Sequence, residues 1–329
     1  MAKLNRTLTA LAGVRVGHAQ DAKRRTGTTV VLLEPPAMAF ADCRGGWPGS
    51  YDTAASNLGK TFVDRHALFL AGGDVFGYDA AIGIRRYLLE KGLAKPKGGS
   101  RMPAIMGTNI YDLGFADIEG CDYTDLGYRA CVEASSRPVA MGNVGAGLGA
   151  TVGPFFDRKG SEGTKGGVGS SAAQVGSWTV GALLVTNCVG NVFDPFENRT
   201  IAGTRHAGGK GFLEMDDVLD DYVKESANRF GTTIGVVGTD APLDHEQLAR
   251  LVELAHDGIA LAIRPAHMST DGDTILGFCT RRGKGDRPDF RAFDAVHHVA
   301  VREVARAAVQ AVRAARSLGG VPGLAGRKG

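Results

Sequence analysis

The amino-acid sequence predicts a mixed α+β protein in which layered sheets are covered by helices. Apolar runs rich in β-branched residues, such as residues 28–33 (TTVVLL), indicate buried strands. Segments such as residues 79–91, with apolar side chains three and four positions apart, indicate helices. Strands and helices do not alternate in a regular βαβ rhythm, so a Rossmann-type sheet is not favoured. Apolar segments continue on both sides of the polar, Gly-rich stretches, which predicts a single domain over residues 1–329.

Four short apolar runs are expected to form the buried strands because of their composition. They are residues 28–33, 181–188, 232–238 and 274–280. The first helix is expected at residues 79–91, and Gly92 is a plausible stop at its C-terminus. The second is expected at residues 216–230, where acidic residues at the start suit the helix dipole.

Two further helices are predicted in the last third of the chain. Asp244 is the expected N-cap of a helix to about Ile259, and Gln247 stands at the capping-box position. Residues 293–318 carry an apolar stripe at helical spacing, which predicts a long amphipathic helix that ends at the glycine pair beginning with Gly319.

Composition and charge exclude several classes of protein. The chain has 43% hydrophobic and 22% charged residues, which is ordinary for a globular protein. A formal charge of +3 without a sustained basic run makes nucleic acid a poor candidate partner. No stretch is apolar enough to predict a membrane span or a signal peptide. The five cysteines are scattered without CxxC spacing, so we expect reduced thiols and a cytoplasmic location.

Several polar clusters could carry chemistry. Residues 142–153 (GNVGAGLGATVG) have GxGxxG-like spacing, but without a surrounding βαβ unit this is a weak dinucleotide signal. His297 and His298 are adjacent on the last predicted helix, so they do not share a face for a metal. Asp271 and Asp273 form either a turn before a strand or a cation-binding loop, although the EF-hand spacing is absent.

The stretch from Gly231 to Thr233 has two interpretations. A turn glycine followed by threonines with high β propensity would be purely structural. A threonine hydroxyl directly behind a glycine could instead be a nucleophile, provided that a base lies beside it.

A set of motifs in a fixed order bears on this choice. They are GVRVGHAQD with TGTTVVLL, LAGGDVFGYDAAIGI, NIYDLG, GNVGAGLGA, KGGVGSSA, VTNCVGNVFDP, GTTIGVVGTDAPL, DGDTILGFCT and SLGGVPGL. With these motifs the chain resembles, nearly end to end, the family of self-processing L-aminopeptidase/D-esterases, β-peptidyl aminopeptidases and nylon-oligomer hydrolases.

The resemblance implies a fold and a maturation step. The fold would be a four-layer αββα sandwich similar to that of N-terminal-nucleophile hydrolases. The precursor would cut itself between Gly231 and Thr232, leaving a large fragment (1–231) and a small fragment (232–329) that stay together. The family usually assembles as homotetramers of processed protomers.

The resemblance also implies roles for individual residues. Thr232 would be the N-terminal nucleophile, with its new α-amino group as the base. Asn187 matches the asparagine that helps bind the oxyanion, and Tyr111 matches an active-site tyrosine. Asp271 and Asp273 match two aspartates near the nucleophile, where carboxylates would hold and tune the new ammonium.

One family residue has no direct counterpart. The lysine of the nylon-oligomer hydrolases aligns with Pro154, and the nearest candidate is Lys165, which other branches of the family also carry. The irregular loops at residues 43–51 and 155–165 are expected to shape specificity.

The expected activity is therefore hydrolysis of a short peptide-like or ω-amino amide through an acyl-enzyme, without a metal or organic cofactor. One alternative is an acyltransferase of the ornithine acetyltransferase type, which has a similar fold and cuts itself before a threonine. The other is an uncleaved scaffold or ligand-binding protein.

Overall fold

A computed structural model describes residues 5–94, 96–97, 100–153, 163–206, 211–224 and 230–326. The strands are β1 (Val14–Asp21), β2 (Thr26–Cys43), β3 (Ser50–Tyr51), β4 (Asp64–Ala71), β5 (Pro96–Lys97), β6 (Ser100–Arg101), β7 (Ile105–Asn109), β8 (Thr151–Val152), β9 (Thr164–Lys165), β10 (Gly167–Val175), β11 (Trp178–Asn187), β12 (Asn191–Asp194), β13 (Arg199–Ala202), β14 (Thr232–Thr239), β15 (Ile263–Arg264) and β16 (Thr274–Cys279). The α-helices are α1 (Ala80–Glu90), α2 (Tyr123–Val132), α3 (Leu219–Lys224), α4 (His245–Ala262) and α5 (Phe290–Ala314). Short 3-10 helices lie at Leu8–Ala10, Ala54–Ser56, Asp74–Asp79, Gly145–Leu148 and Met215–Asp217.

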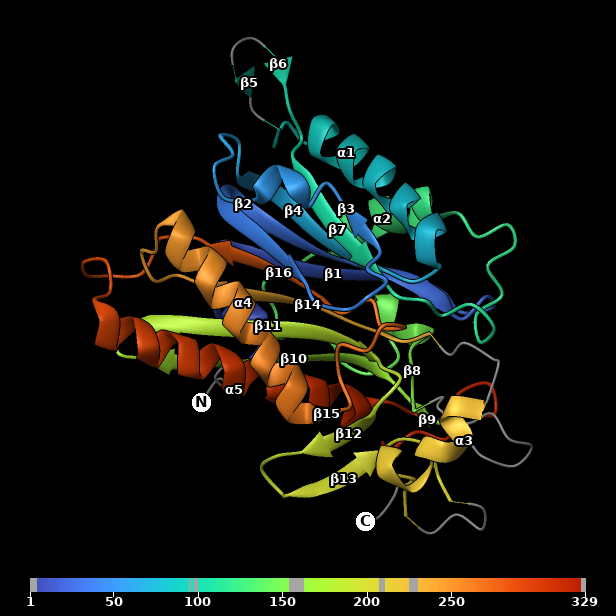
Figure 1. Ribbon diagram of the computed structural model, residues 1–329. Coiled ribbons are helices and arrows are strands. Elements are labelled where there is room, and N and C mark those ends of the chain that lie inside the picture. Colours follow the sequence, from blue (N-terminus) through green and yellow to red (C-terminus); the bar gives the residue numbers. More distant parts are fainter. Residues whose placement is uncertain are drawn as a thin grey trace.

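The main sheet is folded over on itself at its longest strand. In the described part of the chain it runs β10-β11-β14-β16-β2-β4-β7-β3, with β1 also paired to β2. The first half of β2 pairs with β1 and β4, and its second half pairs with β16. The pairing with β4 is interrupted between Leu32 and Ala37, where Pro35 and Pro36 lack the N–H that a ladder requires. Figure 1 shows α1 and α2 outside one half of the sheet and α4 and α5 outside the other, which gives four layers.

Side chains on β2 alternate between two of the buried clusters that fill the spaces between these layers. Val30 and Leu32 belong to the cluster under α1 and α2, whereas Val31 and Leu33 belong to the cluster between the two sheet halves. Successive side chains of a strand point to opposite faces. The uninterrupted apolar run of this strand is thus explained by burial on both faces.

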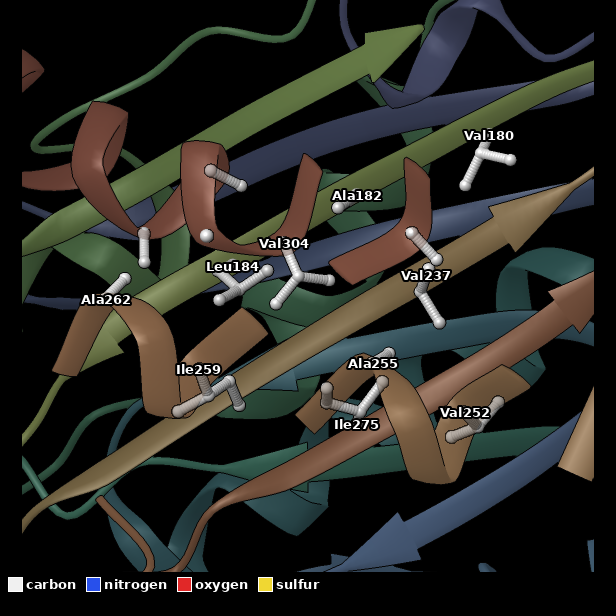
Figure 2. Close-up of a cluster of buried hydrophobic side chains, with 14 of the residues drawn as sticks. Val180, Ala182, Leu184, Val237, Val252, Ala255, Ile259, Ala262, Ile275 and Val304 are labelled. Carbon is white, nitrogen blue, oxygen red and sulfur yellow. The ribbon is translucent and has the colours of Figure 1, made fainter. Parts of the chain in front are cut away.

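The third cluster lies between the other half of the sheet and the C-terminal helices. Figure 2 shows Leu184 of β11, Val237 of β14 and Ile275 of β16 beside Ile259 of α4 and Val304 of α5. The neighbouring side chains on these strands face the central cluster instead. Both faces of β14 are therefore buried, and the strand lies inside the sheet between β11 and β16.

One edge of the sheet brings three chain segments together. Strands β14 and β16 are parallel, so their first residues lie at the same edge. Strand β11 is antiparallel to β14, so its last residue, Asn187, lies at that edge and pairs with Thr232. The turn before β16, which carries Asp271 and Asp273, also begins there.

The predicted elements are present, with differences at their ends. The capping box of α4 is formed by Asp244 and Gln247, as expected. The helix predicted at residues 216–230 is wrong at its start, because Met215–Asp217 is a 3-10 turn and α3 begins at Leu219; residues 225–229 lie outside the described part. Helix α5 ends before residue 318 because Ala315 is extended, and its carbonyl accepts a hydrogen bond from the N–H of Ala325. No described helix is both long and apolar enough to cross a membrane.

Candidate active site

Thr232 is the first residue of β14 and is almost fully buried, with 4% of its surface exposed. Its hydroxyl donates a hydrogen bond to the carbonyl oxygen of the preceding residue, Gly231. The next side chain, Thr233, points to the opposite face of the strand, and its hydroxyl is buried without a partner among the described residues. Of the two adjacent threonines, Thr232 is thus the one whose hydroxyl lies against the carbonyl before it.

Gly231 sits in a space that no larger residue fits. A Cβ atom here would lie 2.3 Å from the backbone nitrogen of Val189 and 2.8 Å from Oδ1 of Asp271. The Gly231 N–H donates to the carbonyl oxygen of Thr270 at 3.3 Å, and the Gly231 carbonyl accepts the N–H of Gly272 at 3.1 Å. The Gly272 N–H therefore polarises the carbonyl that the Thr232 hydroxyl contacts.

Asn187 is held in one orientation by its two amide partners. Its Oδ1 accepts the N–H of Thr151 at 2.9 Å, and its Nδ2 donates to the carbonyl oxygen of Tyr111 at 3.0 Å. The amide NH₂ group has two protons, so a second N–H is left on Nδ2. Asn187 pairs with Thr232 across the ladder. This remaining donor can bind negative charge that develops near the Thr232 hydroxyl.

Asp271 and Asp273 are both 1% exposed but have different partners. Asp273 accepts the N–H of Thr233 at 2.7 Å and the N–H of His267 at 3.0 Å. Asp271 accepts the N–H of Met268 at 3.0 Å. Burial and the charge of Asp273 raise the pKa of Asp271 to about 7. The pair can therefore hold one proton near neutral pH, on the carboxyl group beside Gly231.

A cavity of about 190 Å³ opens onto the Thr232 side chain. Its lining residues are Trp47, Gly49, Asp74, Asn109, Tyr111, Phe230, Gly231, Thr232 and Thr270. The ring of Phe230 lies between two other rings, with centroids 5.0 Å from Trp47 and 5.1 Å from Tyr111. The residues just before Thr232 therefore fill part of this cavity themselves.

The arrangement can carry out acyl transfer at the Gly231 carbonyl. The Thr232 hydroxyl touches the carbonyl, backbone and amide N–H groups can take the oxyanion, and the Asp271 carboxyl group, whose pKa is raised, lies next to it. Among the described residues, no group of three or more His, Cys, Asp or Glu side chains could hold a metal ion.

Comparison with known families decides what kind of protein carries this site. Residues 6–325 match the sequence profile of peptidase family S58. The chain belongs to peptidase family S58. An uncharacterized aminopeptidase of Mycobacterium leprae is 32% identical to it over 364 residues, covering 98% of this chain and 94% of the relative. A 6-aminohexanoate-oligomer endohydrolase of Paenarthrobacter ureafaciens is 27% identical over 276 residues, covering 82% of this chain and 73% of the relative. This S58 chain is a hydrolase of amide bonds.

Solved structures confirm the fold of this S58 peptidase. A β-aminopeptidase of Burkholderia sp. superposes with a TM-score of 0.69 at 23% identity, covering 98% of this chain and 91% of that chain. An L-aminopeptidase D-Ala-esterase/amidase of Ochrobactrum anthropi, described as a variant of the Ntn hydrolase fold, superposes with a TM-score of 0.68 at 21% identity. It covers 98% of this chain and 90% of the other. The expected sandwich of the N-terminal-nucleophile type is thus the fold of this chain.

Lys165, the candidate for the family lysine, does not line the cavity at Thr232. It is fully buried, and its ammonium donates to the carbonyl oxygens of Gly147 and Gly166 at 3.0 Å and of Ala150 at 2.5 Å. These three bonds use its three N–H groups, and the bond to Ala150 connects Lys165 to the Ala150–Thr151 peptide, whose N–H donates to Asn187. Burial lowers the pKa of Lys165 to about 7, and the charge of Asp112 opposes this shift. Pro154, the position of the nylon-hydrolase lysine, lies outside the described residues.

Two residues near the site were missed by the sequence analysis. His267 places Nδ1 2.8 Å from Oδ2 of Asp273, yet a lone histidine between strands gives no local signal of this contact. Asp74 lines the cavity, and burial raises the pKa of its carboxyl group. Its motif, LAGGDVFGYDAAIGI, was part of the resemblance, but spacing alone could not place it beside Thr232, which is far away in the sequence.

Proposed function

We propose that this S58 peptidase cuts itself between Gly231 and Thr232 and then uses Thr232 as an N-terminal nucleophile. The hydrogen bond from the Thr232 hydroxyl to the Gly231 carbonyl oxygen carries this proposal, because it places the attacking oxygen next to the scissile peptide. The N–H of Gly272, 3.1 Å from the same carbonyl oxygen, supports it as a donor to the oxyanion.

Self-cleavage supplies the base that Thr232 lacks in the uncut chain. The hydroxyl oxygen of Thr232 attacks the Gly231 carbonyl carbon, the bond to the Thr232 nitrogen breaks, and the hydroxyl proton ends on that nitrogen. Water then hydrolyses the ester, which gives Gly231 a carboxylate and Thr232 a free α-amino group. An α-amino group has a pKa near 8 and can take the hydroxyl proton during turnover.

The remaining predicted residues position and stabilise the reacting groups. The free N–H of Asn187 binds the oxyanion of the acyl-enzyme reaction. Asp271 and Asp273 hold the new ammonium and tune its pKa. Lys165 acts indirectly, because it polarises the Ala150–Thr151 peptide that orients the Asn187 amide.

The substrate is a short peptide-like or ω-amino amide whose acyl part takes the place of residues 230 and 231. In the uncut chain these residues occupy the acyl side of the scissile bond, so the cavity that they leave is the acyl site. The carboxyl group of Asp74 on its wall can pair with a free ammonium of the substrate, and Trp47 and Tyr111 offer apolar faces. Release of one N-terminal residue fits a cavity of this size better than cleavage inside a folded protein.

The two fragments, 1–231 and 232–329, would remain one particle after cleavage. Strand β14 begins the small fragment and lies between β11, from the large fragment, and β16. Its pairing and its two buried faces hold the fragments together. We further expect homotetramers of processed protomers and a cytoplasmic location.

The substrate class is tested by screening the purified peptidase against α-aminoacyl, β-aminoacyl and 6-aminohexanoyl amides. We expect hydrolysis of at least one aminoacyl amide and a large loss when its amino group is acetylated, because the pairing with Asp74 disappears. Acyl transfer to ornithine that exceeds hydrolysis would identify an acyltransferase instead. No turnover of any amide by fully cut protein would contradict the proposed substrate class.

A further inference from the structure

The two carboxylates before β16 differ in how strongly their surroundings hold a negative charge. Oδ1 of Asp273 accepts the N–H of Thr233 at 2.7 Å. Its Oδ2 accepts the backbone N–H of His267 at 3.0 Å and lies 2.8 Å from Nδ1 of the same histidine. Three donors thus face Asp273, and one of them belongs to a ring that can carry a positive charge.

Asp271 has poorer partners for a negative charge. Oδ2 of Asp271 accepts the N–H of Met268 at 3.0 Å, and Oδ1 is 3.5 Å from the N–H of Val189. Asp271 also forms a β-bridge with Gly231, so its carboxyl group stands beside the peptide that breaks. Two carboxylates that are both buried and act on each other do not both ionise easily, which raises the pKa of Asp271.

His267 is built into the turn in a way that aims it at Asp273. Its backbone has a φ of +59°, in the left-handed region that most residues avoid, and this conformation turns both its N–H and its ring toward the same carboxylate. Behind it lies the ring of His256, edge-on with centroids 5.0 Å apart. Burial and the charge of His267 lower the pKa of His256 to about 4, so His256 is neutral near pH 7.

The charged and titratable groups around His267 come from several elements. Asp271 and Asp273 on its own turn, His256 on α4 and Arg44 just after β2 act on His267 itself. Asp42 near the end of β2 faces His256, and Cys188 after β11 faces the two aspartates. Burial lowers the pKa of His267, but the hydrogen bond and charge of Asp273 outweigh burial and raise it overall. The contact between Nδ1 of His267 and Oδ2 of Asp273 is a charge-assisted hydrogen bond when the ring carries its second proton.

We propose that His267 is a positioning residue that keeps Asp273 ionised and thereby leaves the proton of the carboxylate pair on Asp271. This inference rests on the proposed function of Thr232 and adds a control on it. As the Thr232 oxygen attacks the Gly231 carbonyl carbon, one oxygen of the neutral Asp271 carboxyl takes the hydroxyl proton. Its other oxygen gives a proton to the Thr232 nitrogen as the Gly231–Thr232 bond breaks, so Asp271 ends neutral. In the cut enzyme, the Asp273 anion holds the Thr232 ammonium in place.

The test is the pH dependence of kcat/KM for the cut enzyme, with His267→Gly as the main variant. Glycine accepts the left-handed backbone, so the turn is kept while the ring and its charge are lost. The acid limb reports the loss of a proton from the Thr232 α-amino group. Without the ring, no second positive charge competes with this ammonium for Asp273, so the ammonium keeps its proton to higher pH. We expect the acid limb to move up by about one to two pH units, the effect of one charge-assisted hydrogen bond. Added imidazole should move it back in His267→Gly and leave the wild type unchanged.

Two further variants separate this role from a structural one. His267→Asn keeps a side-chain N–H for Asp273 without a titrating ring, so its acid limb should lie between those of the wild type and His267→Gly. His298→Ala removes an exposed histidine on α5 and should keep the wild-type profile. An unmoved acid limb in cut His267→Gly, or a shift that imidazole does not reverse, would overturn the inference. A denaturing gel shows separately whether the wild-type chain is cut. Activity of an uncut wild-type chain would contradict the proposed function itself, whatever the pH profiles show.

Discussion

Asn187→Ala separates transition-state stabilisation from substrate binding at this site. The substitution removes the Nδ2 donor and breaks the bonds to the Thr151 N–H and the Tyr111 carbonyl. Loss of one oxyanion donor typically lowers kcat by about a hundred- to a thousandfold. We therefore expect kcat to fall by about this factor while KM changes little, because the amide acts when negative charge develops.

The same change also has a stability cost that the structure lets us estimate. It leaves one buried donor and one buried acceptor without partners, at about 1–3 kcal/mol each in the free energy of unfolding. Asn191→Ala is a matched control, because Asn191 is also buried and also bonds a backbone N–H, that of Thr204, and a carbonyl, that of Leu213. Asn191 does not line the cavity, so this variant should lose similar stability and keep kcat near the wild-type value.

The assay is steady-state hydrolysis of a chromogenic aminoacyl amide, with rates divided by the amount of cut chain on a denaturing gel. This correction matters because Asn187→Ala also slows self-cleavage if the amide serves both reactions. Urea unfolding of both asparagine variants gives the stability terms. A rise in KM with unchanged kcat, or an equal loss of kcat in Asn191→Ala, would refute the assigned role of Asn187.

Three other outcomes follow from the same geometry. Asp271→Asn and Asp273→Asn should each lower turnover by about ten- to over a hundredfold in protein that still folds, which is the effect of losing one charge-assisted hydrogen bond. Wild-type rates in both variants would indicate that the two aspartates only form a turn. Activity that a chelator abolishes would indicate a cation-binding loop. The raised pKa of Asp271 means that its ionised form is disfavoured in the folded state, so its contribution to stability is complete below about pH 4 and is lost as the pH rises toward 7. In the uncut Thr232→Ala protein, the free energy of unfolding should therefore fall between pH 5 and 7, and adding Asp271→Asn should make this fall smaller by about 2 kcal/mol, measured by urea unfolding. If the free energy of unfolding has the same pH dependence in both proteins, the result argues against a proton on Asp271. Thr233→Ala should still be cut and keep much of its activity in the same hydrolysis assay, because the Thr233 side chain faces away from the cavity. An uncut, inactive Thr233→Ala would indicate that Thr233, and not Thr232, is the nucleophile.

Local signals were enough to predict most elements of this fold. The buried strands follow from apolar β-prone runs, and Asp244 with Gln247 marks the start of α4, because both signals lie within a few neighbouring residues. The start of α3 was missed, since acidic residues at 216 and 217 suit a 3-10 turn as well as an α-helix. The sheet folds over at β2 because β2 pairs with β4 in its first half and with β16, far away in the sequence, in its second half. No local sequence pattern encodes these pairings.

The site was predicted to the extent that its residues sit in recognisable motifs. Thr232, Asn187 and the two aspartates lie at strand ends that the topology brings to one edge. Lys165 is different, because a charged residue in a Gly-rich loop suggests solvent exposure, whereas three backbone carbonyls satisfy it inside the protein. His267 and Asp74 gain their roles from contacts across the fold, which a reading of neighbouring residues cannot supply.

Cleavage between Gly231 and Thr232 is the central claim, and the chain composition of purified protein tests it most directly. The wild type should run as two chains on a denaturing gel, one ending at Gly231 and one beginning Thr-Thr-Ile-Gly by N-terminal sequencing. The two should elute together under native conditions, because β14 stays paired in the sheet. Thr232→Ala should remain one inactive chain, since it lacks the attacking hydroxyl, and Thr232→Ser and Thr232→Cys should cut slowly. An active wild type that remains a single uncut chain would contradict the account.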